Sequence, residues 1–143
     1  MNIANIVDAK KVETKDHAGN LNGFLIELYK DGDKTTAYLT AAKPGAFKGY
    51  HLHRVRAARY VCIKGKMKII LYRPGEKVAP EEYMLDAAKP QRLFIPKDTA
   101  TGLLNTGDEE AWLINYPDPP YDPSLKDEQV EYTQEELEQG IVK

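Results

Sequence analysis

The stretch GAFKGYHLHRVRAARYVCIKG, from Gly45 to Gly65, places two of the chain's three histidines two positions apart. Side chains two apart on a β-strand project from the same face, so His51 and His53 are expected to point in one direction. The same alternation puts Lys48 on the opposite face. The stretch therefore predicts a strand that presents two imidazoles either as ligands or as acid/base groups.

Charge is distributed unevenly around this strand. Eight lysines and arginines and no acidic residue lie from Lys43 to Lys68, whereas eleven acidic residues and one lysine lie from Asp108 to Glu138. The net charge of −2 argues against a broad attraction for nucleic acid, so no nucleic-acid partner is expected. The basic cluster beside the histidines is either a solvated face or a local site for an anionic small molecule, and the histidines favour the second interpretation.

The length and the apolar pattern limit the class of protein. A chain of 143 residues fits one domain that buries roughly two-thirds of the surface exposed on unfolding. The single Cys62 cannot form an internal disulfide, and no apolar run approaches the roughly 18 residues of a membrane span or shows a signal-peptide pattern. We therefore expect a cytoplasmic protein without a membrane partner.

Most of the chain reads as short strands separated by Gly, Pro and Asp. LNGFLIELYK (21–30) and TTAYLTAA (35–42) are expected to form a hairpin around Asp31-Gly32-Asp33. Further strands are expected within residues 2–15, 59–64, 66–72, 93–96, 101–104 and 111–116. Short strands that recur roughly every eight to twelve residues predict an all-β antiparallel barrel or sandwich.

The C-terminal part changes character. Prolines at 117, 119, 120 and 123 exclude a regular strand there. The spacing of Thr133 and Glu136 is typical of a capping box and predicts a short acidic helix. The predicted organisation is a barrel domain over residues 1–123 and an acidic tail with a short helix over residues 124–143, which belongs to the same domain.

The spacing of the central stretch resembles the two sequence motifs of the cupin barrel. The first motif is matched by Gly45, His51, His53 and Gly65, and the second by Pro96 and Asn105. This resemblance covers most of the chain and implies a cupin-type jelly roll.

Two positions of the cupin motifs depart from the metal-binding pattern. Ala58 stands where the first motif has a glutamate, and Thr101 stands where the second motif has a histidine. Two imidazoles alone rarely hold a divalent metal, and nearby arginines repel a cation. We therefore expect neither a metal nor another cofactor.

Among metal-free cupins, those called RmlC-like, the chain resembles the dTDP-4-dehydrorhamnose 3,5-epimerase family. The similar segments are Lys48–His51 (Arg-Gly-x-His in the family), Arg59–Val61, Leu93–Leu104, Tyr121–Pro123 and the turn at Asp16–Gly19. The resemblance implies a nucleotide-sugar substrate, a homodimer, and proton abstraction next to the ketone of a 4-keto-6-deoxyhexose nucleotide.

The resemblance also implies catalytic roles. His51 corresponds to the base that removes the proton, and Arg59 to a group that stabilises the enolate oxygen. Asn115 stands at the position of the family's tyrosine acid, so Tyr116, one residue later, becomes the expected acid. The aspartate that orients the base in the family has no recognisable counterpart.

A substrate-binding set follows from the same resemblance. Lys48 is expected to bind a phosphate or sugar oxygen and Tyr121 to pack on the nucleotide or sugar. His53, Asn105 and Thr101 complete the set, since they fall within or beside the two motifs.

Two other functions stay open at this point. Gly49 to His53 is also similar to the Gly-x-His-x-His of nucleotide-sugar 3,4-ketoisomerases, in which both histidines move protons on one side of the sugar. A cupin that binds a sugar or nucleotide sugar without catalysis would keep the cleft and lack the chemistry. The three functions give different results with a 4-keto nucleotide sugar. An epimerase exchanges a proton with the solvent, a ketoisomerase yields a 3-keto product, and a binding protein is stabilised by the ligand without exchange.

Overall fold

The computed structural model describes residues 11–31, 35–119, 122 and 124–143. These residues form the strands β1 (Lys11–Lys15), β2 (Leu21–Asp31), β3 (Thr35–Ala42), β4 (Phe47–His53), β5 (Ala58–Lys64), β6 (Lys66–Tyr72), β7 (Glu81–Asp86), β8 (Arg92–Ile95), β9 (Ala100–Leu104), β10 (Ala111–Asn115) and β11 (Gln129–Glu131), and the helix α1 (Gln134–Glu138). The expected strand within residues 2–10 lies outside the described residues.

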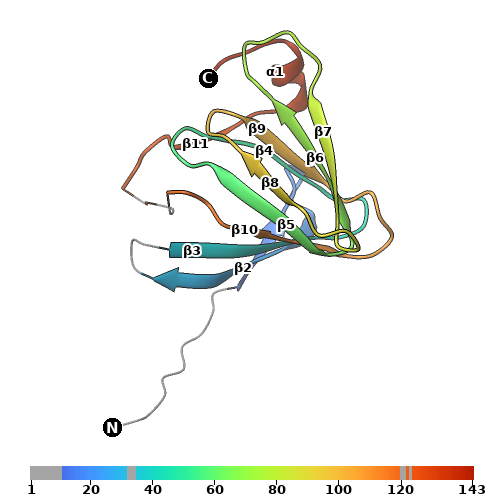
Figure 1. Ribbon diagram of the computed structural model, residues 1–143. Helices are drawn as coiled ribbons and strands as arrows, with labels where there is room; N and C mark the ends of the chain where they lie inside the picture. The colour runs from blue at the N-terminus through green and yellow to red at the C-terminus, as the bar shows by residue number, and fades with distance from the viewer. Residues whose placement is uncertain (1–10, 32–34, 120–121, 123) are drawn as a thin grey trace.

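The strands form two antiparallel sheets that face each other (Figure 1). The six-stranded sheet has the order β1-β2-β3-β10-β5-β8, and the five-stranded sheet has the order β11-β4-β9-β6-β7. This architecture confirms the all-β jelly roll with a short C-terminal helix. The sequence did not predict β7, which is largely exposed, or β11, which has only three residues.

Apolar side chains from the inner faces of both sheets fill one part of the space between them. The buried members of this cluster are Ala42, Cys62, Met67, Ile69, Leu71, Leu85, Ile95, Leu103, Ala111 and Leu113. Met67, Ile69 and Leu113 are completely or almost completely buried. This cluster is the main core, and burial of its apolar surface is the main source of stability.

A second cluster covers the outer face of the five-stranded sheet. Tyr50 and Leu52 of β4 pack there with Leu137 of α1 and Tyr132. The helix begins at Thr133, whose hydroxyl accepts a hydrogen bond from the Glu136 N–H while the Glu136 carboxylate accepts one from the Thr133 N–H. The expected capping box is therefore present, and it fixes the chain where it crosses the sheet. Within the described residues, no helix is long and apolar enough to cross a membrane.

A bulge in β4 changes which side chains face inward. Against β9, Lys48 is opposite Leu103 and His51 is opposite Thr101, so β4 has one extra residue between these pairs. The extra residue shifts the alternation by one, and Lys48 turns to the same side as His51 and His53. The expectation that Lys48 lies on the opposite face is wrong, because strict alternation does not hold across a bulge.

Gly49 allows this bulge because the backbones of β4 and β9 come very close there. Gly49 has a φ of +131°, and a Cβ atom at this position would lie 2.7 Å from the Thr101 carbonyl oxygen and 3.0 Å from the Gly102 Cα. We expect Gly49→Ala to lower the free energy of unfolding by about 2 kcal/mol or more, measured by urea denaturation.

Gly19→Ala is the matched control for this prediction. Gly19 also has a positive φ, of +89°, but nothing lies within 4 Å of its ideal Cβ position. Gly19→Ala therefore adds backbone strain alone, which should lower the free energy of unfolding by about 1 kcal/mol. Equal losses in the two variants would show that the close approach of β9 does not constrain Gly49.

Candidate active site

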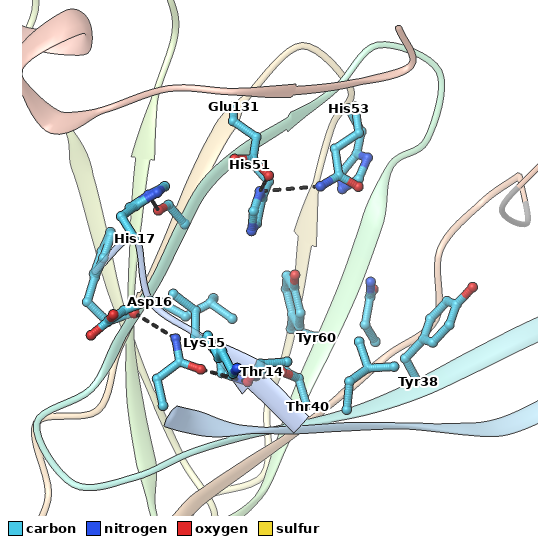
Figure 2. Close-up of a pocket in the computed structure, with 18 of the residues that line it drawn as sticks. Thr14, Lys15, Asp16, His17, Tyr38, Thr40, His51, His53, Tyr60 and Glu131 are labelled. Carbon is cyan, nitrogen blue, oxygen red and sulfur yellow. Dashed lines mark hydrogen bonds and ion pairs between the residues drawn. The ribbon is translucent and has the colours of Figure 1, made fainter. Parts of the chain in front are cut away.

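A cavity of about 660 Å³ lies between the two sheets and borders the apolar core at Leu103 and Tyr60. Strands from both sheets line it, and so does the turn that follows β1. Figure 2 shows polar and ionisable side chains converging on this space from several strands. The volume is within the range of pockets that bind small molecules.

His51 lies on the wall of this cavity that β4 forms. Its Nδ1 atom is 3.5 Å from a Glu131 carboxylate oxygen and 3.4 Å from the Gln129 side-chain nitrogen, both on β11. Nε2 is therefore the ring nitrogen left for a ligand. Burial lowers the pKa of His51 and Glu131 opposes this effect, so the imidazole is neutral near pH 7 and can accept a proton.

His53 is held by a buried ion pair. Its Nδ1 atom is 3.1 Å from a Glu128 carboxylate oxygen and 3.0 Å from an Arg56 nitrogen. Nδ1 can donate to the carboxylate or accept from the guanidinium, but it cannot do both in one tautomer. In either tautomer Nε2 stays available, as an acceptor in the first case and as a donor in the second. Burial and then Arg56 lower the pKa of His53, against the effect of Glu128.

Glu128 joins the C-terminal segment to the loop after β4. Its carboxylate accepts hydrogen bonds from the backbone N–H groups of Val55 and Arg56 and from Arg56 Nε, at 2.9 to 3.2 Å. Burial acts to raise the pKa of Glu128, but these donors, His53 and the Arg56 charge together lower it to about 2. Glu128 is therefore a fixed negative charge.

Lys48 places a cation beside His51 in the cavity. Its ammonium group donates to the Thr40 hydroxyl at 3.1 Å and to the Phe24 carbonyl at 3.4 Å. An ammonium group has three donors, so one remains for a ligand oxygen. Burial lowers the pKa of Lys48 to about 8, with Glu110 opposing, so the group is still mostly charged at neutral pH.

The six-stranded sheet supplies the opposite wall. Tyr60 of β5, Tyr38 and Thr40 of β3 and Asn115 of β10 line the cavity from this side. In Figure 2 the ring of Tyr60 rises from this sheet toward His51. Burial raises the pKa of Tyr60 to about 12, against a smaller effect of Arg56, so its hydroxyl keeps its proton at neutral pH.

The third histidine also reaches the cavity. His17 lies in the turn after β1, and its Nε2 atom is 3.2 Å from the Gly49 carbonyl oxygen. A carbonyl oxygen only accepts, so Nε2 carries the proton and Nδ1 is free. The position of His17 in a polar turn did not indicate this contact, which joins residues 32 positions apart.

Of the residues expected in the site, Lys48, His51 and His53 line the cavity together. Thr101 borders a small extension of about 50 Å³ next to His51. Tyr121 lies outside the described residues. Neither Arg59, Tyr116 nor Asn105 lines the cavity.

Arg59 faces away from the cavity because the inward set of β5 is Ala58, Tyr60 and Cys62. Its guanidinium pairs with Asp118 at 3.2 Å and lies over the ring of Phe94. The structure therefore places this cation on the outer face of the six-stranded sheet.

Tyr116 and Asn105 lie elsewhere. Tyr116 is 44% exposed and follows the end of β10. Asn105 is buried, and its amide group donates to the backbone carbonyls of Ala42 and Glu109 and accepts from the Gly107 N–H. These contacts fix the turn after β9.

The donor set does not match a metal-binding cupin. Ala58 and Thr101 provide no ligand at the two positions described above, and the Thr101 hydroxyl is directed to the Thr99 carbonyl. In the part of the chain that the structure describes, no group of three or more His, Cys, Asp or Glu side chains is arranged to hold a metal ion.

Several site residues were not anticipated from the sequence. Glu128 and Glu131 reach the histidines because β11 pairs with β4, a contact across more than 70 positions that leaves no local signal. Tyr60 did have a signal, since alternation along β5 places it with Cys62 on one face. The sequence could not show that this face, and not the one with Arg59, is the inner one.

Comparison with known proteins agrees with this architecture. Residues 17–129 match the model of the polysaccharide biosynthesis C-terminal domain. The chain is 30% identical over 132 residues to the probable low-salt glycan biosynthesis epimerase Agl13 of Haloferax volcanii, covering 82% of this chain and 84% of that protein.

Solved structures share the fold at lower identity. The capsular polysaccharide assembling protein CapF of Staphylococcus aureus superposes with a TM-score of 0.71 at 21% identity, and oxalate decarboxylase OxdC of Bacillus subtilis with 0.65 at 16%. The matches cover 85% of this chain but only 34% and 29% of those chains, so the chain spans about a third of their length.

The fold and these likenesses define an RmlC-like cupin. More specifically, the chain belongs to the family of polysaccharide biosynthesis C-terminal domains.

The buried ion pair between Glu128 and Arg56 can be tested by its effect on stability. Glu128→Gln removes the carboxylate charge that pairs with the Arg56 guanidinium, in a place where the two side chains are 6% and 9% exposed. We expect a loss of about 3 kcal/mol in the free energy of unfolding at pH 7, measured by urea denaturation. Glu131→Gln, which changes a 59% exposed carboxylate three residues further along the chain, should lose less than about 1 kcal/mol.

The pH dependence gives a second readout of the same substitution. The folded-state pKa of Glu128 is about 2, below the ordinary value of 4.5. Its contribution is therefore complete above about pH 4.5 and is lost as the pH falls toward about 2. A difference between wild type and Glu128→Gln that does not shrink over this range would contradict the assignment.

Proposed function

We propose that this protein is a metal-independent sugar-nucleotide epimerase-like isomerase, which removes a proton next to the ketone of a 4-keto-6-deoxyhexose nucleotide. The observation that carries the proposal is the placement of a neutral histidine, His51, and a cation, Lys48, in one cavity between the sheets. The kinship with a protein named as a glycan biosynthesis epimerase supports the same class of reaction.

In this mechanism His51 is the base. Its Nε2 atom takes the proton from the carbon beside the ketone, and the imidazolium that forms is stabilised by Glu131 at 3.5 Å. Glu131 takes the place of the aspartate that orients the base in the 3,5-epimerase family. General-base catalysis by a positioned histidine contributes typically about 10² to 10⁴-fold to the rate.

Lys48 is the group that stabilises the developing enolate oxygen. Arg59 lies on the outer face, so this role falls to a cation that lines the cavity, and Lys48 lies beside His51 there. A preorganised donor at such an oxygen is worth about 3 kcal/mol of transition-state energy, because it needs no reorganisation when the charge develops. Thr40 and the Phe24 carbonyl fix the position of the ammonium group before the substrate binds.

The nucleotide part of the substrate would lie toward the turn after β1. Lys15 lines that side of the cavity, and its ammonium group can donate hydrogen bonds to phosphate oxygens. We also propose a homodimer, as the resemblance implies, and a molar mass close to the 16.1 kDa of one chain in solution would contradict it.

The second candidate is a 3,4-ketoisomerase. The projection of His51 and His53 from one strand into one cavity favours it, because such a pair can move a proton between neighbouring carbons on the same face of a sugar. A nucleotide-sugar binding protein without catalysis would use the same cavity and show no proton exchange.

Substitution of His51 tests the base. With dTDP-4-keto-6-deoxyglucose as probe in D₂O, we expect the wild-type protein to exchange a proton next to the ketone, followed by NMR. His51→Ala and His51→Gln should slow this exchange by about 100-fold or more. Exchange at the wild-type rate in a variant with unchanged melting temperature would exclude His51 as the base.

The pH profile tests the protonation state. The pKa of His51 is lowered from 6.5, so kcat/KM for exchange should be constant near pH 7 and fall on the acidic side of an apparent pKa below 6.5. Glu131 acts to raise this pKa, so Glu131→Gln should move the acidic limb to lower pH. A limb that moves to higher pH would contradict the pairing of His51 with Glu131.

A further inference from the structure

Tyr60 is an acid/base group that the mechanism above does not use. It projects from β5 of the six-stranded sheet into the cavity, opposite the β4 wall that carries His51. Among the described residues its hydroxyl has no hydrogen-bond partner. Every fully buried side-chain nitrogen or oxygen of those residues has a hydrogen-bond partner. Because the Tyr60 hydroxyl has none, it is not fully buried, and it opens onto the cavity.

We propose that Tyr60 returns a proton to the substrate on the face opposite His51, so that the reaction inverts the configuration of the carbon. The inference rests on the proposed function, since it needs the enolate that His51 and Lys48 produce. The resemblance implied Tyr116 as the acid. The inference assigns this role to Tyr60 of β5 instead.

The first argument is the position of the two groups on facing sheets. His51 belongs to the five-stranded sheet and Tyr60 to the six-stranded one, and the inner faces of stacked sheets lie about 10 Å apart. Both side chains line the large cavity, and both also border its extension of about 50 Å³, together with Lys48. In Figure 2 the Tyr60 ring points toward the His51 imidazole.

His51 and Tyr60 line one cavity and no hydrogen bond joins them among the contacts of the described residues, so a ligand in the cavity can contact both. An enolate is planar at the carbon that has lost its proton. A sugar ring held between the sheets then has the imidazole on one face of this carbon and the phenol on the other. This is the arrangement that epimerisation requires.

The pair His51 and His53 has a different stereochemical consequence. Both histidines come from β4 and approach from the same side. A proton moved between them stays on one face of the sugar, which suits a hydrogen shift between carbons but does not invert a centre. The pair formed by His51 and Tyr60 therefore separates epimerisation from ketoisomerisation.

The proton transfers balance without a further reactant. His51 Nε2 takes the proton, the C–H electron pair becomes the C=C bond of the enolate, and the carbonyl π pair moves to the oxygen beside Lys48. The carbonyl then re-forms, and the C=C pair takes the proton of the Tyr60 O–H on the opposite face. The tyrosinate gains a proton from water, and His51 loses one to water.

The electrostatics of Tyr60 suit this step. Because its pKa is about 12, the group enters the reaction protonated at any pH near neutrality. The Arg56 charge acts to lower this pKa, which means that it stabilises the tyrosinate left after the transfer. Lys48 lines the same cavity and adds a second positive charge.

Tyr60→Phe tests the inference, because it removes one hydroxyl and leaves the ring that packs against the core. With dTDP-4-keto-6-deoxyglucose in D₂O, NMR follows exchange and the appearance of the inverted product separately. We expect exchange within about threefold of wild type and inversion slowed by at least about 100-fold. Tyr83→Phe, an exposed tyrosine on β7, is the matched control and should leave both rates unchanged.

Each other result overturns the inference in a distinct way. Inversion at the wild-type rate in Tyr60→Phe, or loss of inversion in Tyr116→Phe instead, excludes Tyr60 as the acid. Loss of both exchange and inversion in Tyr60→Phe, with an unchanged melting temperature, assigns Tyr60 to the first step and also overturns it. Absence of exchange in the wild-type protein overturns the proposed function itself and the inference with it.

Discussion

The bulge at Gly49 is the constraint on which the arrangement of this cavity depends. β4 serves two layers, since Tyr50 and Leu52 pack outward under α1 while the side chains of the other set face the space between the sheets. One extra residue in β4 turns Lys48 inward beside the histidines. Without the extra residue of the bulge, the Lys48 ammonium group would lie in the outer apolar cluster, where an unpaired charge is strongly unfavourable. The bulge thus improves the packing of one face and assembles the site on the other.

The ion pair of Glu128 with Arg56 has a related function on the same wall. A buried ion pair adds little net stability, because the desolvation of both charges offsets their attraction. This pair instead connects β11 to the loop after β4 and sets the hydrogen bonding of His53. The short strand β11 then holds Glu131 next to His51. Both imidazoles are therefore positioned by carboxylates at the two ends of one short segment, Glu128 directly before β11 and Glu131 at its end.

The space between the sheets is divided between stability and chemistry. The cluster around Met67, Ile69 and Leu113 provides the apolar burial, while the cavity beside it keeps lysine, histidine and tyrosine side chains in partly buried positions. Burial displaces the pKa of Lys48, His51 and Tyr60 in the direction that favours the neutral form of each group. Displaced pKa values that gather in one cavity are typical of functional sites. Two walls that come from different sheets can also contact both faces of a flat ligand, whereas a single strand contacts only one face.

The sequence by itself determined the features that depend on local physics. The hairpin of β2 and β3, most of the remaining strands, the capping box at Thr133 and the shared face of His51 and His53 all follow from patterns that span a few residues. The tertiary structure alone decided which face of β5 is inner, and so whether Arg59 or Tyr60 enters the cavity. It also decided the side on which Lys48 lies and the arrival of Glu128 and Glu131. The reason is that alternation fixes which residues share a face, whereas the register between strands, the bulges and the choice of inner face arise from contacts between segments far apart in the chain.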